Sequence, residues 1–141
     1  MSADYFLDTN VLLYCFDPID LRKQRIAQML VDEAAANGKG RISSQVCQEF
    51  CNVMLHKLKD DIPITKLMSF LEATAFPMLS VFPSPRLIAE ALRIHTQTQY
   101  RFYDSLIVAA ALESGASILY SEDLQHGREI GGLRIVNPFL E

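Results

Sequence analysis

The chain has 141 residues, of which 50% are hydrophobic, and a formal net charge of −4. This length and composition predict a single domain over residues 1–141 with one sizeable buried core. The acidic balance argues against a protein that holds nucleic acid by a broad basic surface, but it leaves open binding through a metal ion.

Short apolar runs alternate with helical patterns, which predicts an α/β domain built on a mainly parallel sheet. In chain order the expected elements are a strand over 5–7, helices over 9–16 and 21–36, a strand over 41–43, helices over 45–59 and 65–75, a strand over 79–82, helices over 85–98 and 102–114, and strands over 117–120 and 134–136. Asp20, Ser44 and Ser84 are predicted to cap the helices that follow them. Gly38 and Gly115 are expected to end helices.

Four of the 17 acidic residues lie at the margins of apolar segments rather than on solvated faces. Asp8 and Asp123 each follow a predicted strand, and the carboxyl ends of parallel strands meet at one crevice where ligands bind. Glu49 lies within a helix, among core residues. Asp104 begins the most apolar helix. A carboxylate at such a margin is costly unless it is paired, hydrogen-bonded or bound to metal.

Other roles remain open for two of these acids. Asp104 could cap its helix, where the positive end of the helix dipole favours a negative charge. Glu49 could pair with a basic residue that is distant in the sequence. The remaining acids are expected to be solvated charges; they include Asp60 and Asp61.

Several carboxylates without an imidazole among them favour a hard cation, Mg²⁺ or Mn²⁺, over zinc. Such a cation activates water and stabilises the charge that develops when a phosphodiester is attacked. Metal-dependent nuclease chemistry is therefore expected. Because the sequence contains neither a GxxxxGK[ST] loop nor a GxGxxG turn, it does not support nucleotide-driven or dinucleotide chemistry.

The three cysteines and the chain start favour a reduced, cytoplasmic location. Zinc binding by Cys47, Cys51 and His56 lacks a second ligand pair, so free and mostly buried thiols are predicted. The longest apolar stretch, 106–112, is far shorter than the roughly 20 residues of a membrane span. The first basic residue is Arg22, so no secretory signal and no membrane contact are expected.

Four segments of the chain together resemble the PIN-domain nucleases, and within them the VapC toxins of bacterial toxin–antitoxin pairs. They are Phe6-Leu7-Asp8-Thr9-Asn10-Val11-Leu12, Gln45-Val46-Cys47-Gln48-Glu49-Phe50, Tyr103-Asp104-Ser105-Leu106-Ile107-Val108-Ala109-Ala110-Ala111 and Ser121-Glu122-Asp123-Leu124-Gln125-His126-Gly127. Each motif alone is weak, whereas the ordered set covers nearly the whole chain.

The resemblance implies a three-layer α/β/α sandwich and a Mg²⁺- or Mn²⁺-dependent endoribonuclease that leaves a 5′-phosphate and a 3′-hydroxyl. It also implies a homodimer and inhibition by a cognate, VapB-like antitoxin. The acids that match the family's catalytic and metal-binding positions are Asp8, Glu49, Asp104 and Asp123. The matching polar positions, which orient ligands, water or phosphate, are Thr9, Asn10 and Ser121. Glu122 is expected to point away from Asp123.

Basic residues near these positions are candidate contacts for RNA phosphates, or solvated charges: Arg22, Lys23, Arg25 and Arg101. Two other functions stay open. The chain could be a PIN-domain nuclease that matures RNA or cuts DNA without being a toxin. It could also be a non-catalytic module that binds a partner's arginine in its acidic pocket. The residues alone name neither the RNA target nor the number of metal ions.

Overall fold

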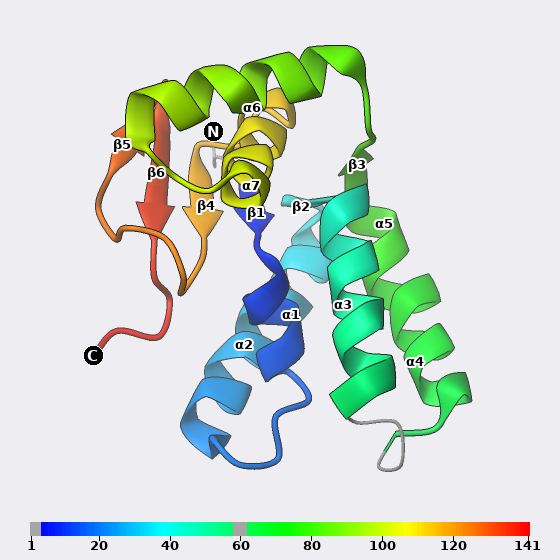
Figure 1. The fold of residues 1–141 in the computed structure, drawn as a ribbon. Coiled ribbons are helices and arrows are strands. Elements are labelled where there is room, and N and C mark those ends of the chain that lie inside the picture. The colour runs from blue at the N-terminus through cyan, green and yellow to red at the C-terminus, as the bar shows by residue number, and fades with distance from the viewer. Residues whose placement is uncertain (1–3, 58–61) are drawn as a thin grey trace.

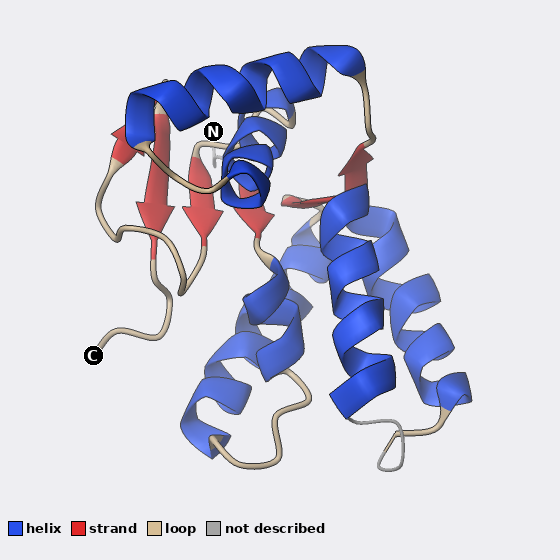
Figure 2. Ribbon diagram, in the orientation of Figure 1, coloured by secondary structure: helices blue, strands red, loops and turns tan. Residues whose placement is uncertain are grey.

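The computed structural model describes residues 4–57 and 62–141, which form one six-stranded sheet with helices packed around it (Figures 1 and 2). The strands are β1 Tyr5–Leu7, β2 Gly40–Ser43, β3 Leu79–Val81, β4 Ile118–Tyr120, β5 Glu129–Ile130 and β6 Leu133–Val136. The helices are α1 Thr9–Tyr14, α2 Leu21–Asn37, α3 Ser44–Lys57, α4 Ile64–Phe70, the π-helical turn η1 Leu71–Ala75, α5 Phe76–Met78, α6 Pro85–Thr98 and α7 Phe102–Glu113.

The sheet has the order β3-β2-β1-β4-β6-β5, and all neighbouring strands are parallel except β5 and β6. From the central strand β1 the chain adds β2 and β3 on one side, and it later adds β4 and β6 on the other. Figure 1 shows β1, β4 and β6 pointing the same way, with α1 continuing from the carboxyl end of β1. The order of strands therefore reverses beside β1, which is where ligands bind in open α/β sheets.

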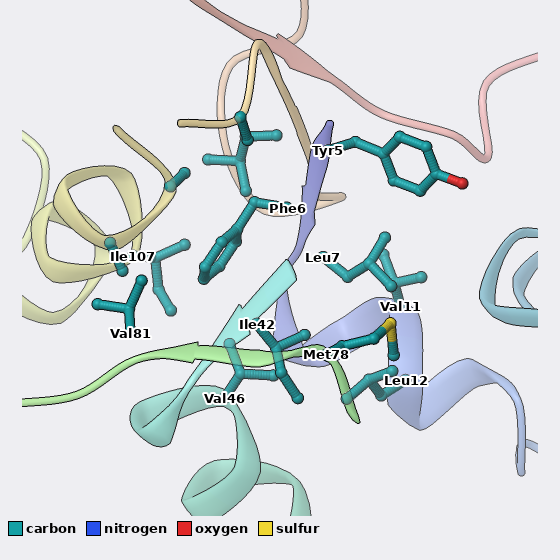
Figure 3. Packing of buried hydrophobic residues seen from close by; sticks show 14 of the residues in the cluster. Tyr5, Phe6, Leu7, Val11, Leu12, Ile42, Val46, Met78, Val81 and Ile107 are labelled. Atoms are coloured by element: carbon teal, nitrogen blue, oxygen red, sulfur yellow. The ribbon is translucent and has the colours of Figure 1, made fainter. Parts of the chain in front are cut away.

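Side chains of β1 alternate between two buried faces of the sheet. Figure 3 shows Phe6 on the side of Ile107, while Tyr5 and Leu7 lie on the other side, with Leu7 near Val11. Burial of both faces is typical of parallel sheets covered by helices. The α/β/α sandwich predicted from the sequence is confirmed.

Close packing on β2 leaves no room for a side chain at Gly40. A Cβ atom at Gly40 would lie 2.6 Å from Sδ of Met78 and 2.7 Å from Cβ of Ala34. These neighbours belong to α5 and α2, so both helices pack on the same face of the sheet. The absence of a side chain at Gly40 allows that approach.

The predicted helix caps are confirmed at two positions and wrong at a third. Lys23 N donates to Asp20 Oδ1 at 3.0 Å, and Leu87 N donates to Ser84 Oγ at 3.0 Å. At α3, however, the side chain that accepts from Val46 N is that of Ser43, at 3.3 Å. Ser44 lies one residue inside the helix, and its hydroxyl donates to a carbonyl on β3.

Other boundaries also differ from the sequence prediction. The segment expected as one helix over 65–75 consists of α4 and the π-helical turn η1, and the short helix α5 then continues to the start of β3. The strand β5, which the sequence did not predict, pairs with β6 through a turn in which Gly131 and Gly132 have φ of 55° and 86°. The predicted helix end at Lys59 and the solvated acids Asp60 and Asp61 lie outside the described residues.

Two other predictions concern thiols and membranes. Cys15, Cys47 and Cys51 are free, and the first two are buried, as predicted. Among the helices of residues 4–57 and 62–141, none combines the length and the apolar character needed to cross a bilayer.

Candidate active site

Asp8 follows β1 directly and is the most buried of the four predicted acids, with 7% of its surface exposed. Its Oδ1 accepts from Thr9 N at 2.7 Å and its Oδ2 from the Ser121 hydroxyl at 2.8 Å. Burial raises the pKa of Asp8 to about 6. Those two hydrogen bonds lower this pKa, and the charges of Asp123 and Glu49 raise it.

Glu49 reaches the same place from the middle of α3, which packs against α1. Its Oε1 accepts from the Thr9 hydroxyl at 3.2 Å and from Gln45 Nε2 at 3.2 Å. Within the described part of the chain, no Lys or Arg forms an ion pair with Glu49. The alternative of a structural salt bridge at this position is therefore wrong for those residues.

Asp123 lies in the loop after β4, beside the carboxyl end of β1. Its Oδ2 accepts from Asn10 Nδ2 at 3.0 Å, and its backbone N donates to the Ser121 hydroxyl at 3.2 Å. Asn10 Oδ1 in turn accepts from Glu122 N at 3.3 Å. Residues more than 110 positions apart in the sequence thus share one hydrogen-bonded cluster, since both strands end at the same edge.

Asp104 lies in the first turn of α7 and is partly buried. The residue before the helix is Arg101, and no side chain forms a cap hydrogen bond there, so Asp104 does not act as the cap. Burial raises the pKa of Asp104, the charge of Asp123 raises it further, and the charge of Arg101 lowers it. The effect of Asp123 indicates that Asp104 lies near that acid.

The structure brings the four acids to one region but not into contact with a common point. In residues 4–57 and 62–141, no group of three or more His, Cys, Asp or Glu side chains is close enough to hold a metal ion. This applies equally to the zinc alternative at Cys47. Asp8, Glu49 and Asp123 are linked through Thr9, Asn10 and Ser121 instead, and carboxylates without a cation between them repel one another.

Glu122 faces away from this cluster, toward α2. It pairs with Lys23 and accepts from the Tyr14 hydroxyl at 2.6 Å, while Lys23 Nζ lies 4.9 Å from the Tyr14 ring centroid. Arg22 donates to the Phe139 carbonyl oxygen at 2.7 Å. Two of the predicted phosphate contacts therefore hold parts of this chain together.

The other two basic candidates differ in their distance from the acids. Arg25 is an exposed residue of α2. Arg101, also exposed, is close enough to Asp104 to lower its pKa. Arg101 is thus the one of the four that the structure places beside the acidic pocket.

Two hollows flank the acids along α3. The first, of about 280 Å³, includes Gln45 and Gln48, which precede Glu49. The second, of about 630 Å³, includes Val53 and Lys57, which follow it. Gln45 was missed by the sequence analysis. Its position one helical turn before Glu49 was the available signal, because residues four apart share a helix face.

Comparisons with known proteins identify the family and the fold. A family model described as PIN domain matches residues 5–128. The search of curated protein sequences found no match. A toxin–antitoxin complex from Klebsiella pneumoniae contains a chain with a TM-score of 0.65 and 17% identity, covering 96% of this chain and 98% of that one.

A second solved structure, FitAcB from Neisseria gonorrhoeae, gives a TM-score of 0.61 and 18% identity over 96% of this chain and 98% of that chain. Identities this low show a shared fold and nothing more. The family model, in contrast, spans most of the sequence, from β1 to beyond Asp123. The chain therefore belongs to the PIN domain family, whose members are generally nucleases that use divalent metal ions.

Proposed function

We propose that this protein is a single-domain, Mg²⁺- or Mn²⁺-dependent endoribonuclease that acts as the toxin of a type II toxin–antitoxin pair. The observation that supports the proposal is the hydrogen-bonded cluster of Asp8, Glu49 and Asp123 beside the carboxyl end of β1, with Asp104 nearby on α7. Asp8 is the decisive member, because it is buried and no described residue forms an ion pair with it. A buried carboxylate of this kind is stabilised by a bound cation.

The donor set fits a hard divalent cation. It consists of carboxylate oxygens, with hydroxyl and amide groups beside them and no imidazole or thiol, and oxygen ligands suit Mg²⁺ and Mn²⁺. The same four acids would hold the metal. When bound, such a cation makes a water more acidic and offsets the negative charge that develops on an attacked phosphodiester.

The neighbouring polar residues orient the acids for this role. Thr9 contacts both Asp8 and Glu49, and Ser121 contacts both Asp8 and the backbone of Asp123. Asn10 holds the Asp123 carboxylate. Hydrogen bonds of this kind fix the direction of metal-binding carboxylates and contribute to metal affinity.

Among the four predicted basic residues, Arg101 is the one whose charge acts on an acid of the site, so it is our first candidate for contact with an RNA phosphate. Lys and Arg position a nucleic-acid backbone without reading its sequence. Arg25 remains a second candidate, and contacts of Arg22 and Lys23 with RNA would compete with their present intramolecular partners. If Arg101→Ala leaves the salt dependence of RNA binding unchanged, then Arg101 does not contact an RNA phosphate.

The test of the nuclease is cleavage of a labelled mixture of total tRNA and other structured RNA by purified protein free of antitoxin. Discrete cuts are expected with Mg²⁺ or Mn²⁺ and none with EDTA. The Asp8→Asn variant should not cut, whereas Asp32→Asn, at an exposed acid of α2, should cut like the wild type. Cutting of DNA alone would favour the nuclease that is not an RNA toxin.

The toxin role is supported by the fold shared with the Klebsiella pneumoniae structure, which is described as a toxin–antitoxin complex. Expression of the wild type in the bacterial cytoplasm should arrest growth, and expression of the Asp8→Asn variant should not. A small VapB-like partner should relieve the arrest. Metal-dependent RNA cutting without growth arrest would instead favour a role in RNA maturation. Metal-independent partner binding without any cutting would favour the non-catalytic module.

The proposed protein is a homodimer. Leu92 is 53% exposed on α6, and a second copy would bury such an apolar side chain. Light scattering of the purified protein tests this directly. A mass near 15.9 kDa would mean that the chain stays monomeric.

A further inference from the structure

The hollow that precedes Glu49 along α3 has an unusual lining for a site beside an acidic pocket. We call it the aromatic hollow, because Phe82, Phe102 and Tyr103 contribute to its wall together with Gln45 and Gln48. The three aromatic side chains are 57%, 36% and 66% exposed. None of the described residues that line the hollow carries a charge.

The aromatic hollow is connected to the proposed active site through Gln45. Gln45 Nε2 donates both to Glu49 Oε1 at 3.2 Å and to the Tyr103 carbonyl oxygen at 3.1 Å. Tyr103 directly precedes Asp104 in α7. A phosphodiester held at the acids therefore has a neighbouring nucleotide within reach of the Tyr103 ring.

The second hollow, which we call the charged hollow, offers different chemistry. It is lined in part by Asp17, Lys57, Glu122 and Asp123. It also contains apolar side chains, such as Leu13 and Val53, but a face of its aromatic ring, Tyr14, is covered by Lys23, whose Nζ lies 4.9 Å from the ring centroid. In the aromatic hollow, a base can stack on a ring while its polar edge reaches a glutamine amide, and aromatic stacking of this kind is sequence-tolerant.

We propose that the aromatic hollow binds one unpaired nucleobase of the RNA strand, next to the phosphodiester that lies at the four acids. This proposal rests on the proposed nuclease function, and it adds the requirement that the base beside the cleaved phosphodiester is unpaired. A base within a duplex is stacked on its neighbours and is not available to Tyr103. The protein consequently selects single-stranded or looped RNA at the cleavage position. The volume of about 280 Å³ is near the lower end of ordinary ligand pockets, about 300 to 1,000 Å³, so it suits one base rather than several.

A fluorescent base tests the binding step without relying on cleavage. The probe is a series of single-stranded RNA octamers, each with 2-aminopurine at one position, titrated with protein in Ca²⁺, which also takes oxygen ligands. Wild type and Tyr103→Phe should quench 2-aminopurine strongly at one position. Tyr103→Ala should lose that quenching and bind roughly fivefold to 150-fold more weakly, the range measured for one base stacked on an aromatic side chain.

Phe76→Ala is the matched control, because Phe76 is a 45% exposed aromatic residue on α5 that does not line the aromatic hollow. It should quench and bind like the wild type. Octamers with one abasic position complete the test. Removal of the base that stacks should weaken binding to the wild type but not weaken binding to Tyr103→Ala any further, because the two changes remove the same interaction.

The outcomes separate this proposal from the nuclease itself. Position-specific quenching that needs Tyr103, from a protein that cuts neither RNA nor DNA, would support the base site and refute the nuclease. Metal-dependent RNA cutting with equal quenching in wild type and Tyr103→Ala would refute the base site alone. Dissociation of a dimer by Tyr103→Ala, with unchanged base dependence, would assign the aromatic hollow to a second copy of this chain and refute the proposal.

Discussion

Replacement of Asp8 with Asn should stabilise the metal-free protein at neutral pH while it removes the nuclease activity. The pKa of Asp8 rises from 3.8 to about 6, mainly because burial disfavours the charged carboxylate. Between these two pH values the folded chain holds a proton on Asp8 that the unfolded chain has released. The free energy of unfolding therefore falls as the pH rises through this window and stays low above it.

The size of the effect follows from the same numbers. At about 1.36 kcal/mol per pH unit, the difference between 3.8 and about 6 makes the charged Asp8 cost about 3 kcal/mol at pH 7.5. Asparagine keeps an oxygen that can accept from Thr9 N, but it cannot accept from both Thr9 and Ser121 as the carboxylate does. After this loss is subtracted, Asp8→Asn should still gain about 1 to 3 kcal/mol in free energy of unfolding at pH 7.5. This gain raises the melting temperature of the variant by roughly 3 to 10 °C.

Thermal melts followed by circular dichroism in EDTA, from pH 4 to pH 8, measure this difference. Near pH 4 the variant should melt at or below the wild type, and its melting temperature should rise relative to the wild type as the pH rises to about 6. Asp32→Asn is the control, because this exposed acid on α2 lies outside the acidic cluster and should change stability by no more than about 0.5 kcal/mol. Addition of Mg²⁺ should raise the melting temperature of the wild type more than that of Asp8→Asn. A variant that melts below the wild type at pH 7.5 in EDTA would refute the reasoning.

Three further substitutions test the packing around the site by urea unfolding. Gly40→Ala should destabilise the fold by roughly 1 to 3 kcal/mol, because its Cβ would lie 2.6 Å from Sδ of Met78; an unchanged midpoint would contradict this packing. Ser43→Ala should lower the free energy of unfolding by about 1 kcal/mol, because it removes the hydroxyl that caps α3. An unchanged free energy of unfolding would mean that this hydroxyl does not stabilise the helix. Lys23→Met should cost roughly 1 to 3 kcal/mol, because it leaves the partly buried Glu122 carboxylate without its partner; weakened RNA binding with unchanged stability would reverse this assignment.

The architecture could be predicted from the sequence because its signals are local. The apolar runs at 5–7 and 117–120 and the cap at Ser84 each specify an element within a few residues. Once the strands are known to be parallel, acids that follow different strands are expected at one edge. This geometric rule is sufficient to predict, from the sequence, that Asp8 and Asp123 lie close together.

The features that the sequence did not predict depend on contacts between distant segments. The two residues of β5 become a strand only because β6 pairs with them across the turn at Gly131. Ser43 rather than the predicted Ser44 caps α3, because the Ser44 hydroxyl faces β3. The ion pair of Glu122 with Lys23 could not be predicted, because the two residues are 99 positions apart in the sequence.

The hydrogen bonds around Asp8 explain how a costly arrangement persists in the folded chain. A carboxylate has about four acceptor positions, and Thr9 and Ser121 occupy two of those on Asp8. The same two residues also contact Glu49 and the backbone of Asp123, so the acids are oriented in pairs by neutral groups rather than by cations. Neutral donors leave the negative charge of the pocket intact and leave acceptor positions free. At neutral pH, where Asp8 is charged, a bound cation would compensate the remaining cost of burial, and this would couple the stability of the fold to the metal that the proposed chemistry requires.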